Sequence, residues 1–500
     1  MSSTSHRLLG GHRTAGNGAV IVLFAAAAFL ALIGGLMAAV LPWWFILMLS
    51  VLPALALAGL LLPELAILGL LVLLCGMVPA GMSPQITLGP GVIKAHEVGL
   101  MLLFGLTLMR VARLPPLGAY WAWVTPVLLF LVLTVTGAMV GKVLYDAPMK
   151  LVLSEVRNQM FWLLVFVVTY LVQSESQLRR LTSGIMFVAL LLSGFVIAQF
   201  VTGHSFIQDA RVEGLVTLNQ ANSDIVRSTA GGGIYVIVFS ILLLLARLMT
   251  RSISMPLALP ILAALVAAVV VTFGRGIWIA TMFVSLLMAF RLMRWKGVVN
   301  VLIAVTVGIA VAVTVLASFK PAIVGAALDR MVSTTQETLK RNTSLGWRAE
   351  EDRYAADHIV SSPLWGIGLG TPYKPLVRMN GMTVTESDEV LTRYIHNAYL
   401  GLWLKLGVVG FFAALWLSWA TIRRGLLLLE HLTEPRMQSL TAASIGGFLV
   451  PVITSFTQPE WLTQTGIAFF ALMLGVLICV HRLAPSLNPM SDQSGRTVRV

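Results

Sequence analysis

Residues 298–318 read VVNVLIAVTVGIAVAVTVLAS, a run of twenty-one residues without a charged side chain. The hydrocarbon core of a bilayer is about 30 Å thick, and a helix needs about 20 apolar residues to cross it. Backbone polar groups have no water partner in lipid, and the run lacks the alternation of a barrel strand. The stretch therefore predicts a transmembrane helix.

Runs of the same kind recur along the whole chain of 500 residues. Hydrophobic residues make up 58% of it and charged residues only 11%, with a mean hydropathy of +0.90. Soluble proteins are about 25% charged, and disordered chains have few apolar residues, so both classes are excluded. We predict an all-α polytopic membrane protein with about 12–14 transmembrane helices. The fourteen candidate spans are residues 19–41, 43–62, 64–82, 92–109, 120–141, 159–173, 181–201, 229–246, 254–273, 276–290, 298–318, 398–420, 438–457 and 461–480.

The lysines and arginines of the short loops predict the orientation of these spans. With the N-terminus in the cytoplasm, seventeen basic residues fall on the cytoplasmic side and seven in the short outside loops. This asymmetry follows the positive-inside rule and accounts for most of the net charge of +13. The competing explanation is a nucleic-acid surface, but the charges form two-residue clusters at helix ends. We expect no nucleic-acid partner, and both termini in the cytoplasm.

Residues 319–397 form an outside loop that is too long for a simple connector. Nine basic and nine acidic residues make it neutral overall. The spacing of its apolar residues predicts helices over 321–340 and 346–361, and Gly366-Ile-Gly-Leu-Gly370 requires a tight glycine turn. We therefore divide the chain into an N-terminal transmembrane bundle (1–318), the helical outside loop (319–397), C-terminal transmembrane helices (398–481) and a cytoplasmic tail (482–500).

Two arginines stand out because charges at the edge of the membrane are costly and tend to be functional. Arg275 lies in a hairpin of two or three residues between the ninth and tenth spans. A guanidinium there can bind a phosphate with two hydrogen bonds, or it can simply extend its charge to the interface. Arg348 begins the second loop helix beside Trp347, where a solvated position is the alternative.

Two further outer segments carry polar side chains. Arg211 belongs to a loop with Asn219 and Asn222, which alone is typical of a solvated loop. His396 marks the point where the long loop re-enters the membrane. Because histidine exchanges a proton near neutral pH, His396 is a candidate general base, although a polar residue of the interface is the plainer interpretation.

Several motifs are missing from the sequence, and their absence narrows the chemistry. The sequence has no HExxH, no EF-hand, no DxD-type acidic pair and no Walker loop. We therefore expect neither a metal nor a cofactor, and no nucleotide substrate. An outside active site then needs a substrate that carries its own leaving group, such as a lipid diphosphate sugar. Arginines would bind the diphosphate, and a neutral base would activate an acceptor hydroxyl.

The order of these motifs resembles that of the O-antigen ligase and O-antigen polymerase-like superfamily of bacterial envelope enzymes. The usual Ser-Arg-Gly is replaced by Gly274-Arg275-Gly276, which leaves the arginine intact. His396-Asn-Ala-Tyr-Leu400, with Gly407-Val-Val-Gly410 behind it, is the most specific part. Together with Arg211 to Asn222, Trp347-Arg348 and the glycine turn, the motifs cover about residues 205–412.

The resemblance implies an inverting, metal-independent glycosyltransferase of the membrane C-type fold in the bacterial inner membrane, with its long loop in the periplasm. The donor would be an undecaprenyl diphosphate-linked oligosaccharide held by Arg275 and Arg348, with Arg211 as a secondary contact. His396 would take the proton of the acceptor hydroxyl. Further substrate-binding residues would be Asn397, Tyr399 and Trp347.

Two questions stay open on the sequence alone. The acceptor is lipid A-core oligosaccharide in a ligase and the next lipid-linked repeat unit in a polymerase; the number of spans slightly favours a polymerase of O-antigen or exopolysaccharide. Polysaccharide-assembly proteins are candidate partners in either case. The alternative function is a small-solute transporter, which requires charges near the membrane midplane. Only Lys94, His96, Glu97 and Lys405 are candidates for such charges.

Overall fold

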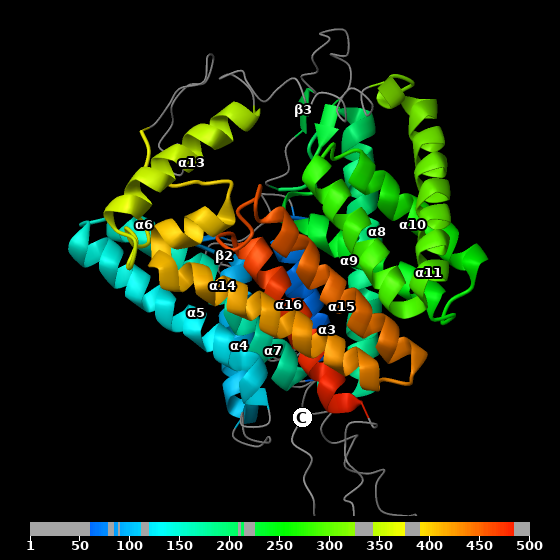
Figure 1. Cartoon of the computed structure of the whole chain (residues 1–500), viewed down its shortest axis with the longest axis horizontal. Coiled ribbons are helices and arrows are strands. Elements are labelled where there is room, and N and C mark those ends of the chain that lie inside the picture. The colour runs from blue at the N-terminus through cyan, green and yellow to red at the C-terminus, as the bar shows by residue number, and fades with distance from the viewer. Residues whose placement is uncertain are drawn as a thin grey trace, which may run out of the picture.

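The computed structural model describes residues 61–78, 85–88, 91–111, 120–208, 212–214, 226–325, 344–375 and 391–484. In this part of the chain the fold is a helical bundle, so the prediction of an all-α protein is confirmed (Figure 1). Two small antiparallel hairpins join helices. β1 (Gln85–Leu88) pairs with β2 (Gly91–Lys94), and β3 (Val212–Gly214) pairs with β4 (Val226–Ser228).

The helices of the described residues make up nearly all of the bundle. In chain order they are α3 (Pro63–Leu74), α4 (Ala95–Val111), α5 (Trp121–Met139) with the π-helical η3 (Val140–Leu144), α6 (Met149–Gln159), η4 (Met160–Leu163), α7 (Leu164–Leu171), α8 (Glu175–Thr202), η6 (Gly231–Gly233), α9 (Ile234–Met249), α10 (Met255–Val270), α11 (Arg275–Phe319), α13 (Ser344–Ser361), α14 (Ala398–His431), α15 (Pro435–Thr454) and α16 (Gln464–Leu483).

Eight helical stretches of the described residues are long and apolar enough to cross a membrane, and α3 and α10 are shorter apolar helices. The protein is therefore a multi-pass membrane protein. The eight stretches are Trp121–Leu144, Met149–Leu171, Glu175–Thr202, Gly231–Met249, Arg275–Phe319, Ala398–His431, Pro435–Thr454 and Gln464–Leu483.

Every predicted span from residue 64 onward coincides with a helix, whereas the first two spans lie almost wholly outside the described residues. Several predicted boundaries were wrong, and the 398–420 helix, for example, continues to His431. The 64–82 helix ends at Leu74, just before Gly76 turns the chain at φ +66°. The 92–109 helix begins only at Ala95, after strand β2. The 159–173 helix begins at Met149, because the polar α6 continues into η4 and α7.

Helix α11 consists of two arms that meet at Arg294, where the backbone leaves helical geometry (φ 54°, ψ −142°). A Cβ on Gly297 would lie 2.4 Å from the carbonyl oxygen of Ala289, so the chain folds back tightly there. Figure 1 shows the second arm, in yellow-green, rising along the right edge of the molecule. The arms correspond to the predicted spans 276–290 and 298–318.

Stacked aromatic rings fix the centre of the bundle. Trp162 of η4, Phe130 of α5, Phe470 of α16 and Trp461 are all fully buried. The ring centroids of Trp461 and Phe470 lie 4.4 Å apart, and those of Phe130 and Trp162 lie 5.5 Å apart. Aromatic pairs of this kind stabilise a core by about 0.5–1.5 kcal/mol beyond the area that they bury. The outer loops therefore rest on a rigid base.

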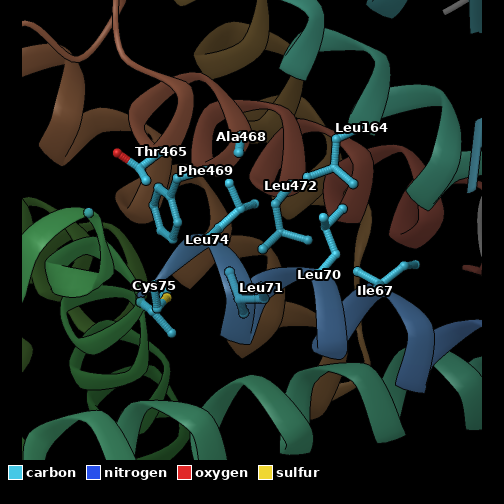
Figure 2. A pocket seen from close by; sticks show the side chains of 12 residues that line it. Ile67, Leu70, Leu71, Leu74, Cys75, Leu164, Thr465, Ala468, Phe469 and Leu472 are labelled. Atoms are coloured by element: carbon cyan, nitrogen blue, oxygen red, sulfur yellow. The ribbon is translucent and has the colours of Figure 1, made fainter. Parts of the chain in front are cut away.

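The contact between α3 and α16 leaves only a small apolar gap (Figure 2). Leu71 and Leu74 of α3 face Phe469 and Leu472 of α16 across a space of about 20 Å³. A cavity needs about 10–15 Å³ of such space to hold one water molecule. This gap belongs to the packing of the core and has no room for a substrate.

The two ends of the bundle differ in their charged contacts. At the end where α16 terminates, Arg180 pairs with Glu64 at 2.6 Å and Arg291 pairs with Glu430 at 2.6 Å. The opposite end carries α13, the β3–β4 hairpin and the start of α14 (Figure 1). The second end is the one for which the sequence predicts an outside location.

Candidate active site

The connection between α13 and α14 is set by the glycine turn that the sequence predicts. Gly366, Gly368 and Gly370 have φ values of +67°, +76° and +82°. A Cβ on Gly368 would lie 2.0 Å from the backbone nitrogen of Gly141. Only glycine permits this backbone and this approach, and the prediction of a tight glycine turn is confirmed.

Backbone hydrogen bonds hold the turn against three helices. The N–H of Ile367 donates to the carbonyl oxygen of Leu404 in α14 at 2.7 Å, and the N–H of Leu369 donates to that of Gly137 in α5 at 2.8 Å. The N–H of Gly370 donates to the Glu155 carboxylate of α6 at 2.8 Å. Because the turn is fixed in this way, α13 lies over the beginning of α14.

His396 immediately precedes α14 and contacts α13 through Glu351. The distance from Nδ1 of His396 to Oε2 of Glu351 is 2.7 Å. An ionised carboxylate can only accept a hydrogen bond, so Nδ1 carries the proton and donates a hydrogen bond to Glu351, and the ring presents the lone pair of Nε2. Among the described residues Nε2 has no hydrogen-bond partner, and the side chain is 30% exposed. His396 is thus oriented as a base.

Glu351 is held by three donors. It accepts hydrogen bonds from the ring and from the backbone N–H of His396 and forms an ion pair with Lys374 at 2.5 Å. Burial alone would raise the pKa of Glu351, but the hydrogen bonds and charges of His396 and Lys374 outweigh it and lower that pKa. Glu351 is therefore a carboxylate that stabilises a protonated imidazole.

Arg348 lies three residues before Glu351 on α13 and shares its surroundings with Arg275. Burial lowers the pKa of Arg348, and the positive charge of Arg275 acts in the same direction, while Tyr394 and Glu351 oppose it. The Nε of Arg348 is buried without a hydrogen-bond partner among the described residues. Two guanidinium groups that repel one another, one of them with an unused donor, favour the approach of an anion.

Arg275 is the first residue of α11. The hairpin before it has four residues, 271–274, rather than the two or three predicted, and Phe273 adopts a positive φ of 48° in it. The N-terminus of a helix carries a partial positive charge that favours anions. The partial positive charge of the helix N-terminus therefore adds to the attraction that the guanidinium of Arg275 exerts on an anion.

The remaining predicted site residues differ in their placement. Asn397 caps α14 by accepting from the N–H of Leu400 at 3.3 Å and donates a hydrogen bond to Asp352. Tyr399 is only 5% exposed and donates its hydroxyl to the carbonyl oxygen of Val452, so it packs α14 against α15. Trp347 is half-buried on α13.

Arg211, Asn219 and Asn222 lie outside the described residues, as do residues 326–340 of the first predicted loop helix.

The structure adds two side chains that the sequence did not identify. Glu351 falls four residues after Trp347 and three after Arg348, and this helical spacing is a signal that places all three on one face. Tyr394 meets the His396 ring edge-on, with 4.8 Å between the ring centroids. Nothing in the local sequence indicates that contact.

An apolar groove of about 630 Å³ begins at Arg275 and lies between α10 and the two arms of α11. Its walls include Val266 of α10, Phe283 of the first arm and Ile309 of the second. Arg275 is the only charged side chain among the described residues that line it. The described residues contain no group of three or more His, Cys, Asp or Glu side chains that could hold a metal ion.

A family model described as O-antigen ligase matches residues 260–415. The match runs from α10 into α14 and contains Arg275, Arg348 and His396. No curated protein matches the chain. The resemblance to the O-antigen ligase/polymerase-like family, first inferred from the motifs, is confirmed over this range.

Proposed function

We propose that this O-antigen ligase-like membrane protein transfers an undecaprenyl diphosphate-linked glycan to an acceptor hydroxyl, with His396 as the base. One observation carries the proposal. The ring of His396 is fixed by Glu351 at 2.7 Å with Nε2 open, and Glu351 and Arg348 lie on the same helix, where the charge of Arg275 acts on Arg348. The proposed base, His396, thus lies close to the arginines that would bind the diphosphate.

The apolar groove supports a lipid-linked donor. A polyprenyl chain fits an apolar channel that runs down the side of the bundle. Its diphosphate would then lie at the end of the groove, beside Arg275 and the N-terminus of α11. Arg348 would bind the same group through its unused Nε–H.

The proposed step forms one bond and breaks one. The acceptor oxygen attacks the anomeric carbon as its proton moves to Nε2 of His396. The bond from the anomeric carbon to the diphosphate oxygen breaks, and the electron pair leaves with the diphosphate. Attack opposite to the leaving group inverts the anomeric centre. Glu351 stabilises the imidazolium, whose proton then passes to solvent.

Electrostatics favour this reaction without a metal. The diphosphate gains negative charge as it leaves, and two fixed guanidinium groups in a partly dehydrated site stabilise that charge more strongly than water does. The arginines therefore occupy the place that a divalent cation takes in other sugar transferases. Arg211 stays the secondary contact of the proposal, with Trp347 beside the anion site.

The cellular setting of the proposal follows the basic loops. We place the protein in the inner membrane with both termini cytoplasmic and the site in the periplasm, where lipid-linked glycans are polymerised or ligated. Polymerase stays the favoured activity over ligase. The transporter alternative requires charges near the membrane midplane. It is weaker because Lys94, Glu97 and Lys405 line one cavity near the His396 end of the bundle, and Glu97 is paired with Arg157.

Alanine variants test the proposal. His396→Ala, Arg275→Ala and Arg348→Ala are each expected to abolish polymeric or ligated glycan on gels of cell extracts. Their membrane content, measured by immunoblot, should equal that of the wild type. The matched control His431→Ala changes an exposed histidine at the other end of α14 and should leave product unchanged. Retained product in all three site variants contradicts the function.

A further inference from the structure

A second, polar cavity of about 530 Å³ adjoins the candidate active site. Tyr394, whose ring contacts that of His396, lines it. Its other walls come from α4, α6, α14 and the segment before α16. Ligand cavities in proteins measure about 300–1,000 Å³, so a sugar or two can enter.

The lining of this cavity carries more positive than negative charge. Four basic and two acidic side chains contribute to the described part of it. Glu97 pairs with Arg157 at 3.4 Å, and Glu155 pairs with Arg393 at 3.0 Å and with Lys405 at 3.5 Å. Lys94 is the fourth basic residue. After these pairings the cavity keeps a positive excess that attracts an anion.

Amide groups complete the lining. Asn158 and Gln159 of α6 and Gln464 of α16 line the cavity, and amide oxygens can accept hydrogen bonds from sugar hydroxyls. The three amide nitrogens donate within the protein, to the carbonyl oxygens of Leu462 and Trp461 and to the carboxylate of Glu97. Gln159 is only 2% exposed, and its Oε1 has no hydrogen-bond partner among the described residues. A buried acceptor of this kind costs free energy unless a ligand donates to it.

We propose that this cavity binds the acceptor glycan through a sugar that carries an anionic group, a carboxylate or a phosphate. The inference rests on the proposed function, because it supplies the acceptor for the base at His396. The cavity and the apolar groove have no described lining residue in common. Donor and acceptor would therefore approach His396 from two different sides.

Binding of small probes to the full chain in nanodiscs tests the proposal. Glucose, glucuronate, glucose 6-phosphate and inorganic phosphate are titrated and followed by calorimetry. We expect at least one of the two acidic sugars to bind about tenfold more tightly than glucose, since one charge-assisted hydrogen bond contributes about that factor. The same sugar should also bind about tenfold more tightly than inorganic phosphate, because phosphate lacks the sugar hydroxyls and their hydrogen bonds. Glucuronate alone would assign a carboxylate sugar, and glucose 6-phosphate alone a phosphorylated one.

Variants locate the binding. Lys94→Gln should weaken the acidic sugar about tenfold, whereas Arg291→Gln, at the opposite end of the bundle, should not. His396→Ala should keep the binding while losing product, which separates this inference from the proposed function. Equal affinity for glucose, phosphate as tight as the sugars, or unchanged binding in Lys94→Gln would overturn the acceptor assignment, even where His396→Ala abolishes product.

Discussion

Glu351 holds the imidazole of His396 with Nε2 open, which is the orientation that the proposed glycosyl transfer requires. Glu351→Gln removes the negative charge that stabilises the imidazolium, so kcat should fall by about 10²-fold with little change in KM. Turnover of a lipid-linked glycan by the purified protein measures both quantities.

Glu350 provides the matched control for this prediction. It precedes Glu351 on α13, and successive side chains of a helix with 3.6 residues per turn point in directions about 100° apart. Glu350→Gln should therefore keep the wild-type kcat and KM. Equal losses in the two variants would mean that Glu351 acts on the fold of α13 rather than on His396.

Glu460 gives the stability of the protein a dependence on pH. It lies in the loop between α15 and α16, and burial raises its pKa from 4.5 to about 7, against the effect of its hydrogen bond with Tyr235. The folded state therefore binds more protons than the unfolded state between these values, and stability falls as the pH rises through this window. Each unit of difference is worth about 1.4 kcal/mol.

The thermal midpoint in nanodiscs should accordingly be highest below about pH 5 and decline until the pH passes about 7, the folded-state pKa. Glu460→Gln keeps the shape of the side chain without its ionisation and should flatten this decline. Parallel curves for the variant and the wild type would show that another group causes the dependence.

Single residues differed in how far the sequence could assign them. The sequence singled out His396 and Arg275 because each lies at the outer end of a predicted span, and Arg348 because it begins the second predicted loop helix. The partner of His396 lies 45 positions away, so its carboxylate could be found only after α13 had been placed on α14. The contact of Tyr399 with Val452 was equally hidden, because the sequence does not show which side of α14 faces α15.

The glycine turn is the element that positions α13. In Gly368→Ala a methyl group would meet the backbone of Gly141, at a φ that alanine rarely adopts. We expect a loss of about 2 kcal/mol or more in stability, and loss of product in the fraction that folds. Gly194→Ala is the control, because a Cβ on Gly194 in α8 meets nothing within 4 Å. Melting temperatures that shift equally in the two variants would contradict this role of the turn.

Elements were predictable where a local rule decides them. Alternating glycines before α14 already indicate a turn, and Pro363 indicates the end of α13. The break of α14 at Gly407 depends on a distant contact, since the N–H of Val408 donates to the carbonyl oxygen of Pro363 at 3.0 Å. The start of the sixth span was placed too late because the charged residues of α6 are typical of a loop, whereas two of them, Glu155 and Arg157, belong to a helix and line the polar cavity.

At the scale of the whole molecule, hydropathy and basic loops sufficed for a multi-pass bundle. They contain no information about how the helices surround one another. The groove beside Arg275 lies between α10 and α11, whereas the walls of the cavity beside Tyr394 include α6 and α14. Both spaces depend on how separate helices pack, so neither could be predicted from the sequence. The division into domains and the side of the membrane stay predictions.

Cysteine labelling decides the orientation on which the proposed donor depends. Cys75 and Cys479 are free but buried, so they should contribute little background. Ser361→Cys adds a thiol at the exposed end of α13, and Thr433→Cys adds one in the loop between α14 and α15. In intact spheroplasts a membrane-impermeant maleimide should label the first variant and should label the second only after permeabilisation. Because α14 runs between these two sites and begins next to His396, the reverse pattern would put the base in the cytoplasm, away from periplasmic lipid-linked glycans, and would contradict both the orientation and the donor.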